Sequence, residues 1–253
     1  MVRGSRKHVL DWTSRPEFPF EVAALLAGAE CTLDDSANWL PRGHEQPDEA
    51  VLDTWGPTGA PGLTNWDDLA DWWLVHRRSA NRPNWDLVVR CRVRGRPGLA
   101  LFEAKAHESE LDRSGKKLAA GCSVHSRENH ERIGAAIDEA RAAYAHASPT
   151  VAISRDSHYQ LSNRLAFSWK LAELGVPNVL VYLGFLGDVG IVDVGVPFRT
   201  EDHWRHAATS YVGAVFPPAL IDVWHSFGKA ETRLILRSRP VLSTSPPVGS
   251  CKV

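Results

Sequence analysis

The stretch NWDLVVRCRVRGRPGLALFEAKA, residues 84–106, decides the fold of this chain. Two short apolar runs flank a segment that contains Gly and Pro, so the stretch predicts two antiparallel strands joined by a turn. We expect the turn to be GRPG, residues 95–98, which pairs Arg94 with Leu99. All further pairs across the hairpin follow from this register.

Charged side chains lie inside the predicted strands. Residues of one parity point to one face of a strand, so Glu103 and Lys105 leave the sheet on the same side. The register places Arg90 opposite Glu103 and Asp86 opposite His107, so Asp86 shares that face, and a bulge or a slip of two residues would bring it beside the pair. An isolated charge in a sheet is costly, so the group needs mutual neutralisation or a ligand. The opposite face is the expected core: Leu87, Val89, Cys91, Val93, Ala100, Phe102 and Ala104.

The rest of the chain alternates predicted helices and strands. We expect helices over 19–29, 63–78, 126–148, 157–175 and 200–216, and strands over 178–187, 190–198 and 232–240. The run 178–187 is apolar throughout, which is typical of a central strand covered on both faces. The order of elements predicts an α/β fold with a central mixed β-sheet flanked by helices.

Composition sets the domain organisation and the compartment. We expect an N-terminal extension over 1–63 packed on the core, one α/β domain over 64–240 and a disordered tail over 241–253. Neither a secretory signal nor an apolar run of about 18 residues is present, so we expect a soluble cytoplasmic protein with no membrane partner.

The charge distribution is compatible with a polyanionic partner. The formal net charge is only −1, yet residues 30–71 hold ten acids against one Arg, and residues 77–96 hold seven Arg against one Asp. Such an asymmetry allows a basic surface for nucleic acid, although charge runs are usually solvated faces. The sequence lacks a Walker-type phosphate loop, a G-x-S-x-G elbow and a dinucleotide fingerprint.

Asp86 at the start of one strand and Glu103-Ala104-Lys105 at the end of the next resemble the site of the PD-(D/E)xK nucleases, the restriction-endonuclease-like phosphodiesterases. The resemblance covers residues 64–187, with Trp85 where the family name has Pro. It implies a core of helix, three strands, helix and strand, with N- and C-terminal additions. The first of the three strands is not identified in the sequence.

The resemblance also implies residue roles. Asp86, Glu103 and the backbone carbonyl of Ala104 would bind Mg²⁺, with Mn²⁺ as an alternative, because hard oxygens suit these ions. Lys105 would orient or deprotonate the attacking water, and Gln160, on the helix after the motif, would face the same water or a phosphate. The reaction would cleave a phosphodiester of nucleic acid, expected to be DNA, to leave a 5′-phosphate and a 3′-hydroxyl.

Other residues could complete a nucleic-acid interface. Arg164 lies one helical turn after Gln160 and could grip a phosphate with two hydrogen bonds. Arg90 and His107 share the face of the motif and are further candidates for nucleic-acid contact. Asp68 and Asn129 are weaker candidates. An acid in the first turn of a helix ordinarily serves to interact with the helix dipole, and the sequence does not distinguish Asn129 from an ordinary solvent-exposed residue.

Alternatives stay open on the sequence alone. Glu103 and Lys105 could form a structural ion pair in a catalytically inactive nucleic-acid-binding or assembly protein, or Lys105 could be the general base of an unrelated α/β hydrolase. If the protein cuts both strands of a duplex, a homodimer would be favoured. Cys122, His125 and His130 have a spacing that could begin a zinc site, but the sequence offers no evident fourth ligand.

Overall fold

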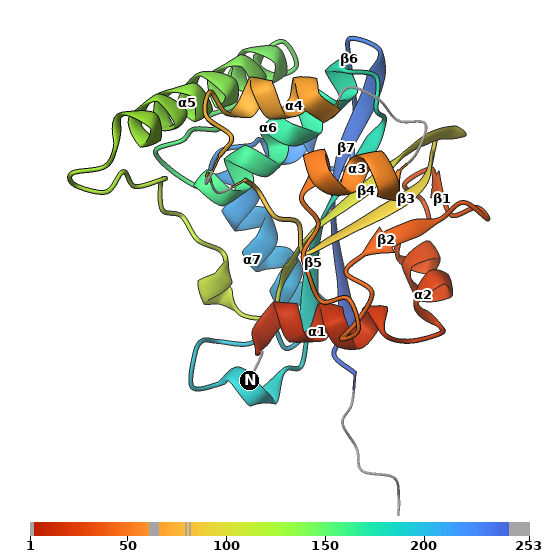
Figure 1. The fold of residues 1–253 in the computed structure, drawn as a ribbon. Helices are drawn as coiled ribbons and strands as arrows, with labels where there is room; N and C mark the ends of the chain where they lie inside the picture. The colour runs from red at the N-terminus through yellow and green to blue at the C-terminus, as the bar shows by residue number, and fades with distance from the viewer. Residues whose placement is uncertain (1–2, 61–65, 79, 81, 243–253) are drawn as a thin grey trace, which may run out of the picture.

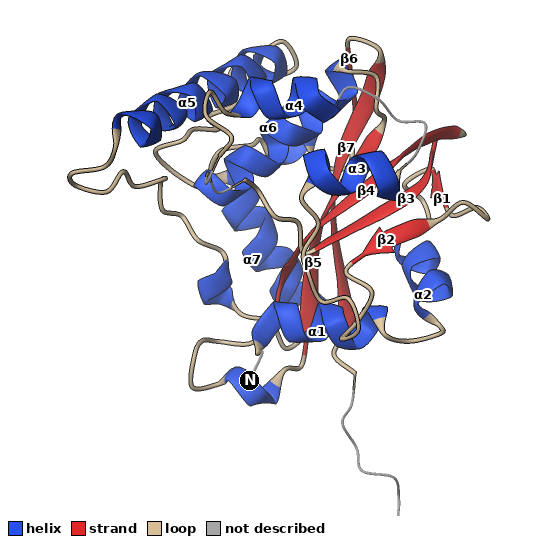
Figure 2. Cartoon of the chain, viewed as in Figure 1, coloured by secondary structure: helices blue, strands red, loops and turns tan. Residues whose placement is uncertain are grey.

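A single mixed sheet with helices on both faces organises the chain (Figures 1 and 2). The computed structural model describes residues 3–60, 66–78, 80 and 82–242. The order of the strands is β1-β3-β4-β5-β7-β6, and β2 also pairs with β3. The predicted α/β class with a mixed sheet flanked by helices is confirmed.

The elements have the following bounds. The strands are β1 (Cys31–Thr32), β2 (Asn38–Leu40), β3 (Leu87–Val93), β4 (Arg96–Lys105), β5 (Asn178–Leu186), β6 (Trp224–Phe227) and β7 (Ala230–Pro240). The helices are α1 (Gly4–Thr13), α2 (Phe18–Leu25), α3 (Leu52–Gly59), α4 (Trp66–Trp73), α5 (Val124–Ala145), α6 (Tyr159–Glu173) and α7 (Glu201–Gly213). The short 3-10 turns within the described residues are η1 (Glu108–Glu110), η2 (Val189–Ile191) and η3 (Pro218–Leu220).

The hairpin β3–β4 turns earlier than the sequence predicted. Arg94 and Gly95 form the turn, with φ angles of 50° and 77°, as a two-residue hairpin turn of the primed kind requires. An Arg in the left-handed region of backbone conformation is unusual. A tertiary contact stabilises it here, since the backbone N–H of Arg94 donates to the carbonyl of Glu30 at 2.7 Å. The strands therefore pair Leu87 with Phe102, and the predicted register was wrong by four residues.

The corrected register improves the convergence of the charged residues. Continuing it by one residue beyond the pair Leu87–Phe102 puts Asp86 opposite Glu103. A shift of four residues preserves parity, so Asp86, Glu103 and Lys105 stay on one face. The predicted core residues of the other face are all in one buried cluster, as expected.

Each face of the sheet has its own core. Residues from α3 to α7 pack on the face of Val88, Leu99 and Leu101, whereas α1 and α2 pack on the face of Leu87 and Phe102. The strand β5 lies between β4 and β7 and is parallel to both, which confirms the predicted central strand. The sheet thus presents the charged residues to the side covered by α6.

Several predicted elements need correction. The helices α2 and α4–α7 occur where predicted, although α4 already ends at Trp73. The predicted start of α4, residues 63–65, lies outside the described residues. Residues 190–198 do not form a strand: they contain part of η2 and a loop whose bridge pairs Pro197 with His107. The valines that suggested a strand there point outward, with Val192 68% exposed. The sequence did not predict α1, α3, β1, β2 or β6, and most of the expected tail, 243–253, lies outside the described residues.

Candidate active site

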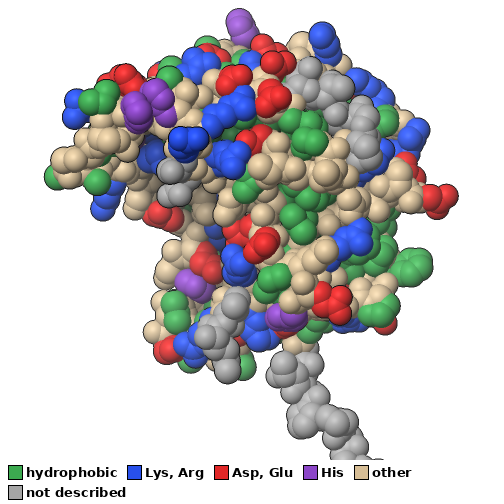
Figure 3. Space-filling view, in the orientation of Figure 1, with side chains coloured by type: hydrophobic (Ala, Val, Ile, Leu, Met, Phe, Trp, Pro, Cys, Tyr) green, Lys and Arg blue, Asp and Glu red, His purple; other side chains and the backbone are tan. Residues whose placement is uncertain are grey.

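A cavity of about 560 Å³ opens where β3 begins and β4 ends. Six of the residues predicted for the site line it: Asp86, Glu103, Ala104, Lys105, Gln160 and Arg164. The two strands supply the acids and the Lys, while α6 supplies Gln160 and Arg164 from one helical turn to the next. Figure 3 shows basic and acidic side chains interspersed on the face of the molecule that it draws.

Glu103 is the centre of a buried ion network. Its carboxylate is 1% exposed, Oε1 lies 2.6 Å from Lys105 Nζ, and Oε2 lies 2.6 Å from Arg164 Nε. Lys105 Nζ also donates to Gln160 Oε1 at 2.7 Å. Two cations therefore neutralise one buried anion, which satisfies the requirement that buried charges be paired.

The guanidinium group of Arg164 is fixed by contacts with several parts of the protein. Its guanidinium carbon lies 4.6 Å from the centre of the buried Trp85 ring. Nη2 donates to the backbone carbonyl of Asn84 at 2.5 Å, and Nη1 donates to Asn163 Oδ1 at 2.9 Å. Because each of its three nitrogens already donates within the protein, Arg164 is better suited to position Glu103 than to bind a phosphate.

Asp86 is bound differently from Glu103. Its Oδ2 accepts the backbone N–H of Ala104 at 2.7 Å, and among the described residues nothing hydrogen-bonds to its Oδ1. Unlike Glu103 it is partly exposed. The geometry leaves one oxygen of Asp86 available to a ligand in the cavity.

The two carboxyl groups have opposite pKa shifts. Burial raises the pKa of Asp86 to about 7, and the charge of Glu103 contributes to the rise. Burial would also raise the pKa of Glu103, but the charges and hydrogen bonds of Arg164 and Lys105 outweigh it and lower that pKa. At neutral pH Glu103 is thus ionised, while Asp86 is poised between its two protonation states.

The segment after η1 forms another wall of the cavity, and the sequence did not reveal it. Ser114, Gly115 and Lys116 line the cavity. The carbonyl of Ser114 accepts the N–H of Tyr159 at 2.9 Å, which ties this segment to the first turn of α6. Lys116 Nζ lies 4.9 Å from the centre of the Tyr159 ring. No periodic pattern marks such a loop, because its position depends on contacts distant in sequence.

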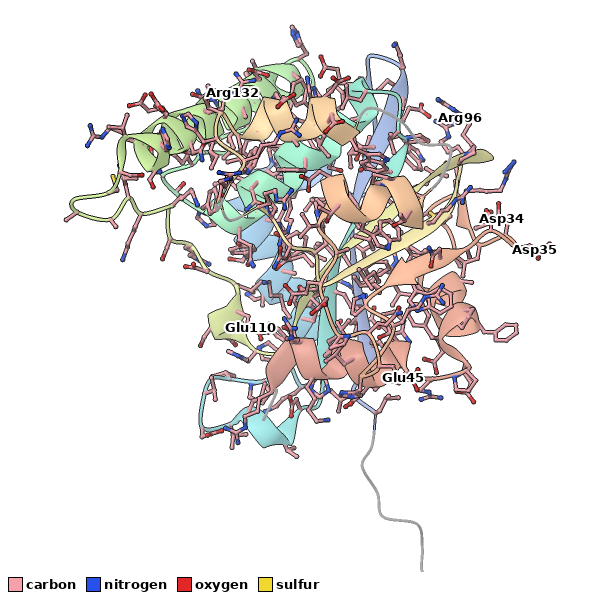
Figure 4. The ribbon with its side chains drawn as sticks, viewed as in Figure 1. Asp34, Asp35, Glu45, Arg96, Glu110 and Arg132 are labelled. Atoms are coloured by element: carbon pink, nitrogen blue, oxygen red, sulfur yellow. The ribbon has the colours of Figure 1, made fainter. Side chains whose placement is uncertain are left out.

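Glu110 is a further acid at the cavity that the sequence did not indicate. Figure 4 shows it close to α1, and its Oε1 accepts the hydroxyl of Ser5 at 3.1 Å. This contact joins the N-terminal helix to the rim of the site. Its other oxygen, Oε2, accepts the backbone N–H of Ala106, so both oxygens of this carboxylate are already hydrogen-bonded within the protein.

Four other predicted site residues do not line the cavity. Arg90 pairs with Leu99 further along β3, and His107 is buried, with Nε2 3.6 Å from Glu110. Asp68 is exposed on α4. Asn129 holds the backbone of His76, donating to its carbonyl and accepting from its N–H at 2.8 Å each. None of these four residues lines the cavity.

The donor set fits a hard divalent cation in part. Asp86 offers an oxygen without a hydrogen bond, and each Glu103 oxygen keeps a lone pair beyond the one bond that it accepts. Carboxylate oxygens are ligands that Mg²⁺ and Mn²⁺ prefer. The two cations on Glu103 weaken its attraction for a metal, so Asp86 would be the stronger ligand.

No protein-family profile, curated protein or solved structure matches this chain. Across the described residues, no helix is both long and apolar enough to span a membrane.

Proposed function

We propose that the protein is a metal-dependent nuclease that hydrolyses phosphodiester bonds of nucleic acid, with DNA as the expected substrate. The observation that carries the proposal is the convergence of Asp86, Glu103, Lys105 and Gln160 at one cavity. These residues come from two strands and a helix, and an ion pair alone would not need Gln160 or an open cavity beside it.

Each residue has a role in this proposal. Asp86 and Glu103, with the carbonyl of Ala104, hold Mg²⁺ or Mn²⁺, which when bound supplies charge stabilisation and an acidic water. Lys105 is held by Glu103 and Gln160, so its ammonium group is oriented toward the phosphoryl oxygens on which charge develops. Gln160 positions Lys105 and the attacking water.

The order of the elements supports a restriction-endonuclease-like core. The helices α1 and α2 precede three neighbouring strands, β2, β3 and β4, which are followed by α6 and then by β5 parallel to β4. With β1 left out, and with α3 and α4 between β2 and β3 and α5 before α6 taken as additions, this order matches the helix, three strands, helix and strand that the resemblance implies. In this reading β2 is the first strand, which the sequence did not identify.

The test uses isosteric variants of the full chain. Supercoiled plasmid, single-stranded DNA and RNA are incubated with Mg²⁺ or Mn²⁺, with Asp86→Asn, Glu103→Gln and Lys105→Met as variants and Asp138→Asn, exposed on α5, as the control. We expect the wild type and the control to cut and the three variants to lose cutting with unchanged circular dichroism. Cutting that survives in all three variants, or that survives chelation of divalent ions, would refute the proposal.

A nucleic-acid-binding protein that does not cut is the second candidate. The observation that favours it is that both carboxylate oxygens of Glu103 already accept hydrogen bonds from cationic side chains, Lys105 and Arg164. The same experiment separates the two functions. DNA binding without cleavage under either metal would establish the second one.

A further inference from the structure

Three side chains with metal-binding atoms meet away from the cavity. His76, in the segment after α4, faces His125 and Glu128 on α5, and their ligand atoms all lie within 4.8 Å of one another. The two imidazole rings stack with centroids 3.9 Å apart, and His76 Nε2 lies 2.5 Å from Glu128 Oε2. Figure 3 shows His side chains gathered over the start of α5.

Helix geometry explains why two of the three ligands are aligned. His125 and Glu128 are three residues apart on α5, so their side chains project from one face of the helix. Ser123 caps this helix by accepting the N–H of Ser126 at 3.1 Å, which fixes its first turn. The pair is therefore presented by a regular element.

The third ligand is positioned by the protein itself. Asn129, next to Glu128 on α5, makes two hydrogen bonds of 2.8 Å to the backbone of His76. These bonds hold His76 against α5 whether or not an ion is bound. A preorganised ligand loses less conformational freedom on binding, which favours affinity.

We propose that His76, His125 and Glu128 form a binding site for a divalent transition-metal ion of the zinc class. Imidazole nitrogens select Zn²⁺, Co²⁺ or Ni²⁺ over Mg²⁺, and three protein ligands leave a fourth position for water. The ion links the segment after α4 to the first turn of α5. Of the residues whose spacing suggested zinc, His125 alone belongs to this group; Cys122 and His130 do not.

The proposal accounts for what an ion pair leaves unexplained. An ion pair between His76 and Glu128 gives no role to His125, whose ring forms no hydrogen bond within the described part of the chain. Two stacked imidazoles beside one carboxylate are repulsive if both are protonated. A cation shared by three ligands uses every group that is present.

The test is metal titration of the full chain without a histidine tag. Zn²⁺ binding is followed by competition with a chromogenic chelator and Co²⁺ binding by its visible absorption, in the presence of excess Mg²⁺. We expect one ion per chain in the wild type, loss of binding in His76→Ala and His125→Ala, and retention in His146→Ala, an exposed residue at the far end of α5.

Two outcomes would overturn the proposal. One is a wild type that binds no Zn²⁺ or Co²⁺, and the other is a stoichiometry that stays at one ion in His76→Ala and His125→Ala. Repeating the titration in Asp86→Asn excludes the cavity as the source, since the histidine site should persist there. Because His125 is exposed, its variant keeps the test decisive even if His76→Ala fails to fold.

Discussion

Arg164 Nε lies 2.6 Å from Glu103 Oε2 in a region where both side chains are buried. Removing Glu103 leaves Arg164 without a buried carboxylate partner, and removing Arg164 leaves Glu103 with Lys105 as its remaining cation, so either change should destabilise the fold.

Arg164→Met should lower the free energy of unfolding by about 3 to 5 kcal/mol, because the buried Glu103 carboxylate loses one of its two cationic partners and Oε2 loses its hydrogen bond. Glu103→Gln in the same chain should not recover the loss, since Lys105 then loses its buried carboxylate partner. Urea denaturation measures both. Arg205→Ala, which breaks a solvent-exposed pair with Glu201, should change stability by less than about 0.5 kcal/mol. An equally small effect for Arg164→Met would contradict the network.

Asp86→Asn should stabilise the metal-free protein at pH 8 and not at pH 4. The pKa of Asp86 is about 7 in the folded protein and is raised from 3.8, so the folded state holds more protons than the unfolded chain between these values. Stability is therefore lost as pH rises through this window, and Asn removes the loss. We expect a gain of about 1 to 3 kcal/mol at pH 8, measured by denaturation with chelator present. A gain that does not depend on pH would disprove this origin.

Gln160→Leu should slow cleavage by about 100-fold while leaving the fold intact, because Lys105 loses one of the two oxygens that orient it. Gln160→Glu retains an acceptor and should keep more activity. Single-turnover rates at saturating enzyme provide the comparison. If Gln160→Leu cuts at the wild-type rate, Gln160 has no part in the reaction.

Lys116→Gln should weaken nucleic-acid binding. It should also reduce the magnitude of the slope of the logarithm of the binding constant against the logarithm of the salt concentration by about one, as expected for one lost phosphate contact. The Lys116 side chain lines the cavity, so this effect depends on the proposed function. Lys229→Gln, in the exposed turn between β6 and β7, is the matched control and should leave the slope unchanged. Equal slopes for wild type and Lys116→Gln would remove Lys116 from the interface.

Gly95→Ala and Gly134→Ala should change stability in opposite directions. Gly95 has a φ of 77° in the hairpin turn, where a Cβ meets no neighbour but the backbone is strained, so Ala should cost about 1 kcal/mol. Gly134 lies within α5, and its added Cβ would approach only the flexible end of Arg155, so Ala should stabilise by about 0.5 to 1 kcal/mol. Thermal unfolding of both variants is sufficient to check the signs.

The sequence alone determined which residues share a face. Alternation along a strand has a period of two, so Asp86, Glu103 and Lys105 had to point the same way in any register that preserved parity. The apolar run of β5 and the helical periodicity of α5 and α6 were likewise local signals, and they established the α/β class with its mixed sheet.

Tertiary structure decided the register and the partners of each charge. The turn at Arg94 depends on Glu30, which is 64 residues away in sequence, and no local pattern reports such a contact. In the same way Arg164 became the counter-ion of Glu103, and Lys116 became part of the cavity wall. Parity is a property of the backbone of one strand, whereas these pairings are set by packing between segments that are far apart in the chain.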